Sequence, residues 1–184
     1  MKLLDRVLRD WRIAQATSLI PPGAEVLDIG CHDGALFRAI GPALRSGLGL
    51  DGDLLGELEG PSYRLVPGFF PDDLPPGSGP FDVVTMLAVF EHIPPDAQEK
   101  LVRAIRDVLR PGGLVVITVP SPAVDHILDV MMKARILDGM ETEQHYGFEP
   151  ADLPPLFQQQ GFDMVVDRRF QLGLNNLYAF ALAG

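Results

Sequence analysis

The sequence predicts an α/β fold: a doubly wound, mostly parallel sheet of about seven strands that ends in a C-terminal antiparallel hairpin. Short apolar runs alternate with segments of helical periodicity, which is the order that builds parallel βαβ units. The run 81–87 (FDVVTML) is almost continuously apolar, as strands buried on both faces of a parallel sheet are. Turn residues alone separate the last two apolar runs, which indicates a hairpin.

The first half of the chain begins with a predicted helix and contains three predicted strands. Residues 2–20 are expected to form an amphipathic helix, which the Pro-Pro-Gly sequence at 21–23 ends, because apolar residues recur there at helical spacing (Leu4, Val7, Leu8 and Trp11). The next expected elements are a strand at 24–29, a helix at 35–40, a strand at 47–50, a brief helix at 54–58 and a strand at 63–66.

The second half continues the alternation. After the strand at 81–87, Pro94 and Pro95 suit the first turn of a helix whose apolar face includes Leu101 and Ile105. The sequence at 110–113 (RPGG) is expected to stop this helix before a fifth strand at 114–119. The remaining expected elements are a helical segment at 124–137, a helix at 149–160 and the hairpin strands 162–170 and 177–182.

The composition indicates one soluble globular domain that spans residues 1–184, since 47% of the residues are hydrophobic and 22% are charged. The net charge of −10 does not favour a nucleic-acid partner, because binding to a phosphate backbone normally requires a basic surface. A single cysteine, Cys31, excludes an intramolecular disulfide and a multi-cysteine zinc site. No signal-peptide core or bilayer-length apolar run occurs, so we expect a cytoplasmic protein without a membrane partner, either a monomer or a homodimer.

The most informative motif is VLDIGCHDG at 26–34. A buried strand delivers Asp28 near its end, turns through Gly30 and starts a helix after Gly34. Glycines allow a tight turn and the close approach of a ligand, and the first amides of the following helix favour an anionic group. Such a turn alone is weak evidence, since many strand–helix connections contain glycine.

Asp51 strengthens the evidence for a nucleotide-like ligand. It lies 21 residues after Gly30, at the end of the second predicted strand, where a carboxylate can accept both hydroxyls of a ribose. A nicotinamide cofactor would favour the pattern G-x-G-x-x-G, but His32 stands where the second glycine belongs. An anion at Asp28 also suits an amine better than a pyrophosphate, and S-adenosylmethionine carries an amine, a carboxylate, a sulfonium and a ribose. The residues therefore favour S-adenosylmethionine.

With these motifs the sequence resembles the class I S-adenosylmethionine-dependent methyltransferases, which have a Rossmann-like fold, and is close to their type 11 group. VLDIGCHDG is similar to the first family motif and GLGLD to the second. FDVVTMLAVFEHI, LRPGGLVVITVP and HYGFEPADLPPLFQQQGF resemble later motifs in the same order. The resemblance covers residues 22–184.

The resemblance implies a set of cofactor-binding residues. It places Asp28 near the methionine amine, the backbone of the turn around the carboxylate and ribose, Asp51 at the ribose hydroxyls, and Leu87 at the methionine end. The full implied set is Asp28, Gly30, Cys31, His32, Gly34, Asp51, Gly52, Phe69, Phe70 and Leu87.

Three positions depart from the family pattern. His32 stands where the family often has glycine, and Gly52 offers no side chain where an apolar residue often packs on adenine. Phe69 stands where an acid often accepts the adenine amine, and Asp72 or Asp73 could take over that role.

Methyl transfer from a sulfonium gains much of its rate from alignment, and it needs a base only if the acceptor arrives protonated. His92, after the fourth strand, and His145 are the candidate catalytic residues, although each also suits a purely structural position. No metal site is expected, since Glu143 and His145 alone form an exposed pair. Residues 121–147, which contain an apolar and methionine-rich stretch, are expected to form a lid over the acceptor.

We therefore expect a methyltransferase that acts on a small-molecule oxygen, nitrogen or carbon. The alternatives that the sequence leaves open are a protein methyltransferase and a noncatalytic cofactor-binding protein with the same fold.

Overall fold

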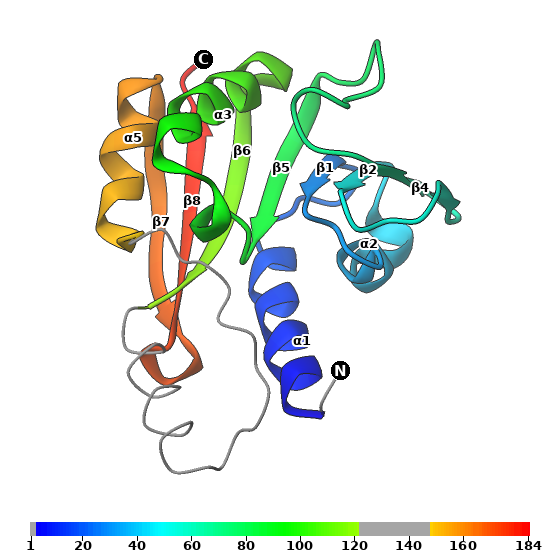
Figure 1. The fold of residues 1–184 in the computed structure, drawn as a ribbon, viewed down its shortest axis with the longest axis horizontal. Helices are drawn as coiled ribbons and strands as arrows, with labels where there is room; N and C mark the ends of the chain where they lie inside the picture. The colour runs from blue at the N-terminus through cyan, green and yellow to red at the C-terminus, as the bar shows by residue number, and fades with distance from the viewer. Residues whose placement is uncertain (1–2, 122–147) are drawn as a thin grey trace.

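The computed structural model describes residues 3–121 and 148–184, and in this part it contains one eight-stranded sheet (Figure 1). The strand order is β3-β4-β2-β1-β5-β6-β8-β7. The strands from β4 to β6 in this order run parallel, whereas β3 pairs with β4, and β8 with β6 and β7, in antiparallel fashion. The predicted doubly wound fold with a C-terminal hairpin is confirmed.

The bounds of the regular elements agree closely with the sequence pattern. The helices are α1 (Leu3–Thr17), α2 (Ala35–Ile40), α3 (Pro95–Val108) and α5 (Leu153–Gln159). The strands are β1 (Glu25–Ile29), β2 (Ser46–Asp51), β3 (Leu58–Glu59), β4 (Tyr63–Pro67), β5 (Phe81–Leu87), β6 (Leu109–Pro120), β7 (Phe162–Phe170) and β8 (Asn175–Leu182). Short 3₁₀ turns are η1 (Gly41–Ala43), η2 (Phe90–His92), η3 (Pro150–Asp152) and η4 (Gln171–Gly173). The helical segment expected at 124–137 lies outside the described residues.

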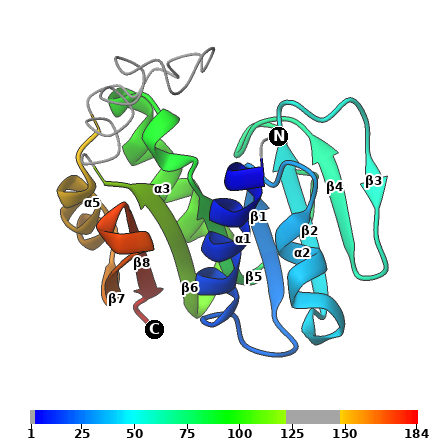
Figure 2. The ribbon, with the colours of Figure 1, turned by 90° about the horizontal axis from the view of Figure 1, so that it is seen from below.

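The helices cover the sheet on both faces (Figure 2). Helices α1 and α2 contribute Ala16 and Phe37 to a core cluster on one face, whereas α3 and α5 contribute Ile105 and Phe157 to the cluster on the other. Strand β5 supplies side chains to both clusters, which explains its nearly continuous apolar sequence. None of the described helices is long and apolar enough to cross a membrane.

Three local expectations are wrong. Residues 54–58 form no helix, because Gly56 interrupts this short segment and its last residue joins β3 instead. Strand β6 begins at Leu109, so the RPGG sequence belongs to the strand, where the pairing with β5 shifts register. Helix α1 does not bury Val7 and Trp11, which remain exposed at the surface while other residues of the helix face the core.

The amino ends of three strands are joined by charged side chains. The guanidinium of Arg110 on β6 contacts the carboxylates of Glu25 on β1 and Asp82 on β5. Asp82 Oδ2 also accepts a hydrogen bond of 2.7 Å from the Glu25 N–H. These contacts hold the register of the central strands at the edge opposite the site described below.

Phe157 provides a test of the packing between α5 and the hairpin. Its side chain is completely buried and stacks on Phe180 with a ring-centroid distance of 4.3 Å. Phe157→Ala should lower the free energy of unfolding by about 3–5 kcal/mol, because the lost apolar burial leaves a cavity. Urea denaturation followed by circular dichroism measures this change. Met164→Ala on the exposed face of β7 should cost less than about 1 kcal/mol, and an equal loss for both variants would contradict this view of the core.

Candidate active site

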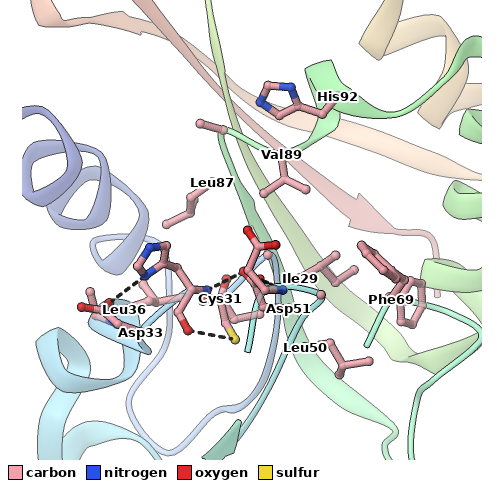
Figure 3. Close-up of a pocket in the computed structure, with 18 of the residues that line it drawn as sticks. Ile29, Cys31, Asp33, Leu36, Leu50, Asp51, Phe69, Leu87, Val89 and His92 are labelled. Carbon is pink, nitrogen blue, oxygen red and sulfur yellow. Dashed lines mark hydrogen bonds and ion pairs between the residues drawn. The ribbon is translucent and has the colours of Figure 1, made fainter. Parts of the chain in front are cut away.

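A cavity of about 760 Å³ opens at the carboxyl ends of β1, β2 and β5 (Figure 3). Ligands bind at this edge in open α/β sheets, where loops and helix starts leave backbone groups accessible. The cavity brings together nearly all of the described residues in the predicted set: Asp28, Gly30, Cys31, His32, Asp51, Gly52, Phe69, Phe70, Leu87 and His92.

Asp28 is a buried acid at the base of the cavity. Only 3% of the residue is exposed, and its Oδ1 accepts a 2.6 Å hydrogen bond from the Thr85 hydroxyl on β5. Burial raises the pKa of Asp28 to about 7, against the lowering effect of Thr85, and the nearby Asp51 charge raises it further. Near neutral pH this carboxyl is therefore present in both its protonated and its ionised form, and a bound cation would favour the ionised form.

The turn after β1 depends on backbone conformations that glycine adopts easily. Gly30 has a φ of 74°, and its N–H donates to the Leu50 carbonyl of β2 over 2.8 Å. A side chain at Gly30 would collide with Val89, so the turn lies directly against the loop after β5. Gly34 also has a left-handed backbone, but it packs beside Leu65 and is not among the residues that line the cavity.

Asp51 connects the ends of β1 and β2. Its Oδ2 accepts a 2.7 Å hydrogen bond from the His32 N–H, and its Oδ1 accepts a 2.9 Å hydrogen bond from the Asp53 N–H. Each carboxylate oxygen retains a lone pair for a further donor. His32 adopts a φ of 46°, which is strained for a residue with a side chain, and its imidazole is exposed.

Cys31 contributes backbone rather than reactivity. Its side chain is buried beside β2, where a side chain at Gly49 would collide with its sulfur. Burial raises the pKa of the Cys31 thiol, and the neighbouring Asp28 and Asp51 charges raise it further. The thiol is therefore protonated and unreactive.

The two adjacent phenylalanines differ in their environments. Phe70 packs against the core, whereas Phe69 is 73% exposed and its ring lies against Gly52. Neither Asp72 nor Asp73 lines the cavity. Asp72 lies 3.4 Å from Lys100, and Asp73 Oδ2 accepts a 2.8 Å hydrogen bond from the Phe69 N–H. This geometry does not support the expectation that Asp72 or Asp73 accepts the adenine amine in place of an acid at position 69.

The segment after β5 forms the other wall. Leu87, Val89 and His92 face Asp51 across the pocket (Figure 3). Between them Ala88 has a φ of 59°, a second strained residue at the rim, and its N–H donates to the Thr118 carbonyl. Glu91 is buried beside His92 and also lines the cavity. His145 lies outside the described residues.

Sequence reasoning missed the contribution of α1. Arg9 and Arg12 both line the cavity, and Arg9 lies 3.4 Å from Asp33 in the cofactor-type turn. Partial burial lowers the pKa of Arg12, whereas the nearby Glu91 charge acts to raise it. Arg9 and Arg12 are three residues apart in the sequence, which indicated that they share one face of a helix. Only the packing of α1 shows that this face lies against the cavity.

The lining fits S-adenosylmethionine. The buried carboxyl of Asp28 suits its amine, the guanidinium of Arg12 suits its carboxylate, and Asp51 suits its ribose. The charged lining residues are mostly acidic: Asp28, Asp33, Asp51, Asp53 and Glu91 against Arg9 and Arg12. This excess of negative charge favours a ligand with a net positive charge.

Comparison with known proteins agrees with this geometry. Residues 2–166 match the model of a family described as a methyltransferase domain. The ubiquinone biosynthesis O-methyltransferase of Methylococcus capsulatus is 30% identical over 171 residues, which cover 85% of this chain and 70% of that protein.

Two solved structures share the fold. A putative methyltransferase of Haloferax volcanii, in complex with the Trm112 methyltransferase activator, superimposes with a TM-score of 0.73 at 16% identity and covers 96% of this chain and 91% of its own. The magnesium protoporphyrin IX methyltransferase of Synechocystis, with bound S-adenosylhomocysteine, has a TM-score of 0.69 at 15% identity and covers 100% of this chain and 88% of its own.

The family match covers most of the chain and supports the class I level of the resemblance, whereas the type 11 subgroup stays a prediction. The chain belongs to the methyltransferase domain family, and it is an S-adenosylmethionine-dependent methyltransferase.

Proposed function

We propose that this protein methylates a hydroxyl oxygen of a small organic acceptor. The observation that carries the proposal is the lining of the cavity, in which the apolar side chains of Ile13, Leu87 and Pro120 accompany the carboxyls of Asp28 and Asp51. Small-molecule sites are concave and combine apolar side chains with a few polar groups, and this lining contains both. The Methylococcus capsulatus relative, named as an O-methyltransferase of ubiquinone biosynthesis, supports oxygen as the acceptor atom.

The cofactor-binding roles follow from the chemistry of each residue. Asp28 would accept hydrogen bonds from the amine, and Arg12 would hold the carboxylate in a charge-assisted pair. Asp51 would accept the ribose hydroxyls while it keeps its backbone contact with His32. When bound, S-adenosylmethionine supplies a methyl group already activated by the sulfonium.

The chain's own contribution to transfer is positioning. Leu87 and Ile13 would exclude water from the acceptor side, and the rigid turn after β1 would fix the donor in line with the acceptor. His92 would orient the acceptor hydroxyl or accept its proton, since it lines the same cavity. His145 and a lid over residues 121–147 remain proposals for the acceptor side.

Turnover with defined acceptors tests this function. The purified protein should release S-adenosylhomocysteine when it is supplied with S-adenosylmethionine and a panel of hydroxylated ring compounds, and mass spectrometry should locate the new methyl group on oxygen. Methylation of added proteins but of no small compound would favour the macromolecular alternative. Cofactor binding without any turnover would favour the noncatalytic alternative.

Asp28 predicts a pH dependence of cofactor affinity. Because its pKa is about 7, the carboxylate that would bind the amine is lost as the pH falls below neutrality. The affinity for S-adenosylhomocysteine should fall by up to about tenfold per pH unit below 7 and change little between pH 7.5 and 8.5. Isothermal titration calorimetry between pH 5.5 and 8.5 measures this profile.

The matched control is Asp28→Asn, which keeps an oxygen for the Thr85 hydroxyl. This variant should bind S-adenosylhomocysteine weakly and without the pH profile. A raised pKa means that the protonated carboxyl stabilises the fold at low pH, and that this stability is lost as the pH rises through about 7. As the pH is raised from 5 to 8, the free energy of unfolding of Asp28→Asn should therefore increase relative to that of the parent protein. A parallel pH dependence of stability in both proteins would contradict the assignment.

A further inference from the structure

The two edge strands of the sheet, β3 and β7, differ in length and charge (Figure 2). Strand β3 has two residues, and the charged residues at this edge, Glu57 and Glu59, are both acidic. Strand β7 has nine residues, and in the described part of the chain no strand pairs with its outer side. The outward N–H and C=O groups of an edge strand can pair with a strand of another chain. The longer edge therefore offers more backbone groups for such pairing.

The middle of β7 is apolar and exposed. Met164 is 39% exposed and Val165 is 54% exposed, although both lie within a strand. The charged residues on either side of them, Asp163 and Arg168, are also exposed. An apolar centre with a charged rim is the composition that protein interfaces have.

A bulge in β7 brings two opposite charges to one face of the sheet. Asp163 and Arg168 pair with residues of β8 that are four positions apart, so they lie on the same face. Residues five positions apart in a regular strand lie on opposite faces, but the register of β7 shifts by one residue between Met164 and Val166. Arg168 donates a 3.2 Å hydrogen bond to Gln15 Oε1 on α1, which identifies this face as the one that α1 covers.

Two copies of β7 can pair in antiparallel fashion about a two-fold axis through the middle of the strand. In this register Asp163 of each copy lies opposite Arg168 of the other, on the same face. An isologous interface is reciprocal, so this ion pair occurs twice. Opposite charges directly across a strand pair stabilise the pairing, and like charges oppose it. Moving one strand by one residue would place Asp163 opposite Asp167 or Arg169, which lie on the other face.

We propose that β7 is a homodimer interface, in which the β7 strands of two copies pair antiparallel and continue the sheet across the two-fold axis. Charged side chains usually protect a sheet edge from other chains. In β7, however, the acid Asp163 precedes the apolar centre and the base Arg168 follows it, so a reversed second copy presents the complementary order. Among the described residues neither side chain has an ion-pair partner, which leaves both charges available to that copy.

Charge reversal tests the interface. The parent protein should form a dimer, and sedimentation equilibrium at micromolar concentrations measures its dissociation constant. Asp163→Arg and Arg168→Asp should each raise this constant by about tenfold or more, because each variant places like charges opposite each other at two sites. Both side chains are exposed, so circular dichroism should show a folded protein in each case. Glu57→Arg makes the same change of charge as Asp163→Arg at the other edge of the sheet, and this control should leave the constant unchanged.

Two rescue measurements are specific to this register. The double variant with Asp163→Arg and Arg168→Asp has opposite charges at both sites again, so its dissociation constant should return toward that of the parent. A mixture of the two single variants should form a heterodimer, because the two arginines of one variant then lie opposite the two aspartates of the other.

Each contrary result has a definite meaning. A parent protein that stays monomeric at millimolar concentration would overturn the proposal. A dimer that both single variants retain with unchanged affinity would overturn it too, since another surface would then join the copies. A double variant that dimerises no better than the single variants would refute the register. These outcomes are independent of the proposed function, because none of the β7 residues lines the cavity.

Discussion

The shape of the site depends on one carboxylate. Asp51 accepts hydrogen bonds from two backbone N–H groups, one in the turn after β1 and one in the turn after β2. These bonds fix the spacing between two loops that sequence places about twenty residues apart, and they hold His32 in a strained conformation. The ion-paired amino ends of β1, β5 and β6 restrain the same strands from the opposite edge. The cavity thus lies between elements that backbone hydrogen bonds and ion pairs of the protein hold together.

The regular elements could be predicted from the sequence because their patterns are local. Strand β5, helix α2 and strand β7 have the bounds that the apolar runs and turn residues indicated. The failures involve information that a single sequence does not contain. Whether the segment at 54–58 becomes a helix or joins an edge strand depends on the proximity of β4, and whether Trp11 is buried depends on which face of α1 meets the sheet.

The part of the site that could be predicted from the sequence consists of residues at the ends of strands. Asp28, Gly30 and Asp51 meet at one cavity because parallel strands present their carboxyl ends at one edge. Arg12 was missed because a helix outside the motifs supplies it. The roles of Phe69 and Asp73 could not be separated either, since only the folded loop shows that Asp73 bonds to the Phe69 N–H and that the ring lies on Gly52.

The acidic lining has a consequence for the direction of the catalytic cycle. A sulfonium gives S-adenosylmethionine one more positive charge than S-adenosylhomocysteine, so the same carboxylates attract the donor more strongly than the spent cofactor. Methyl transfer therefore removes part of the electrostatic attraction at the moment when release becomes useful. Added salt would reduce this preference, because it screens the carboxylates of the lining.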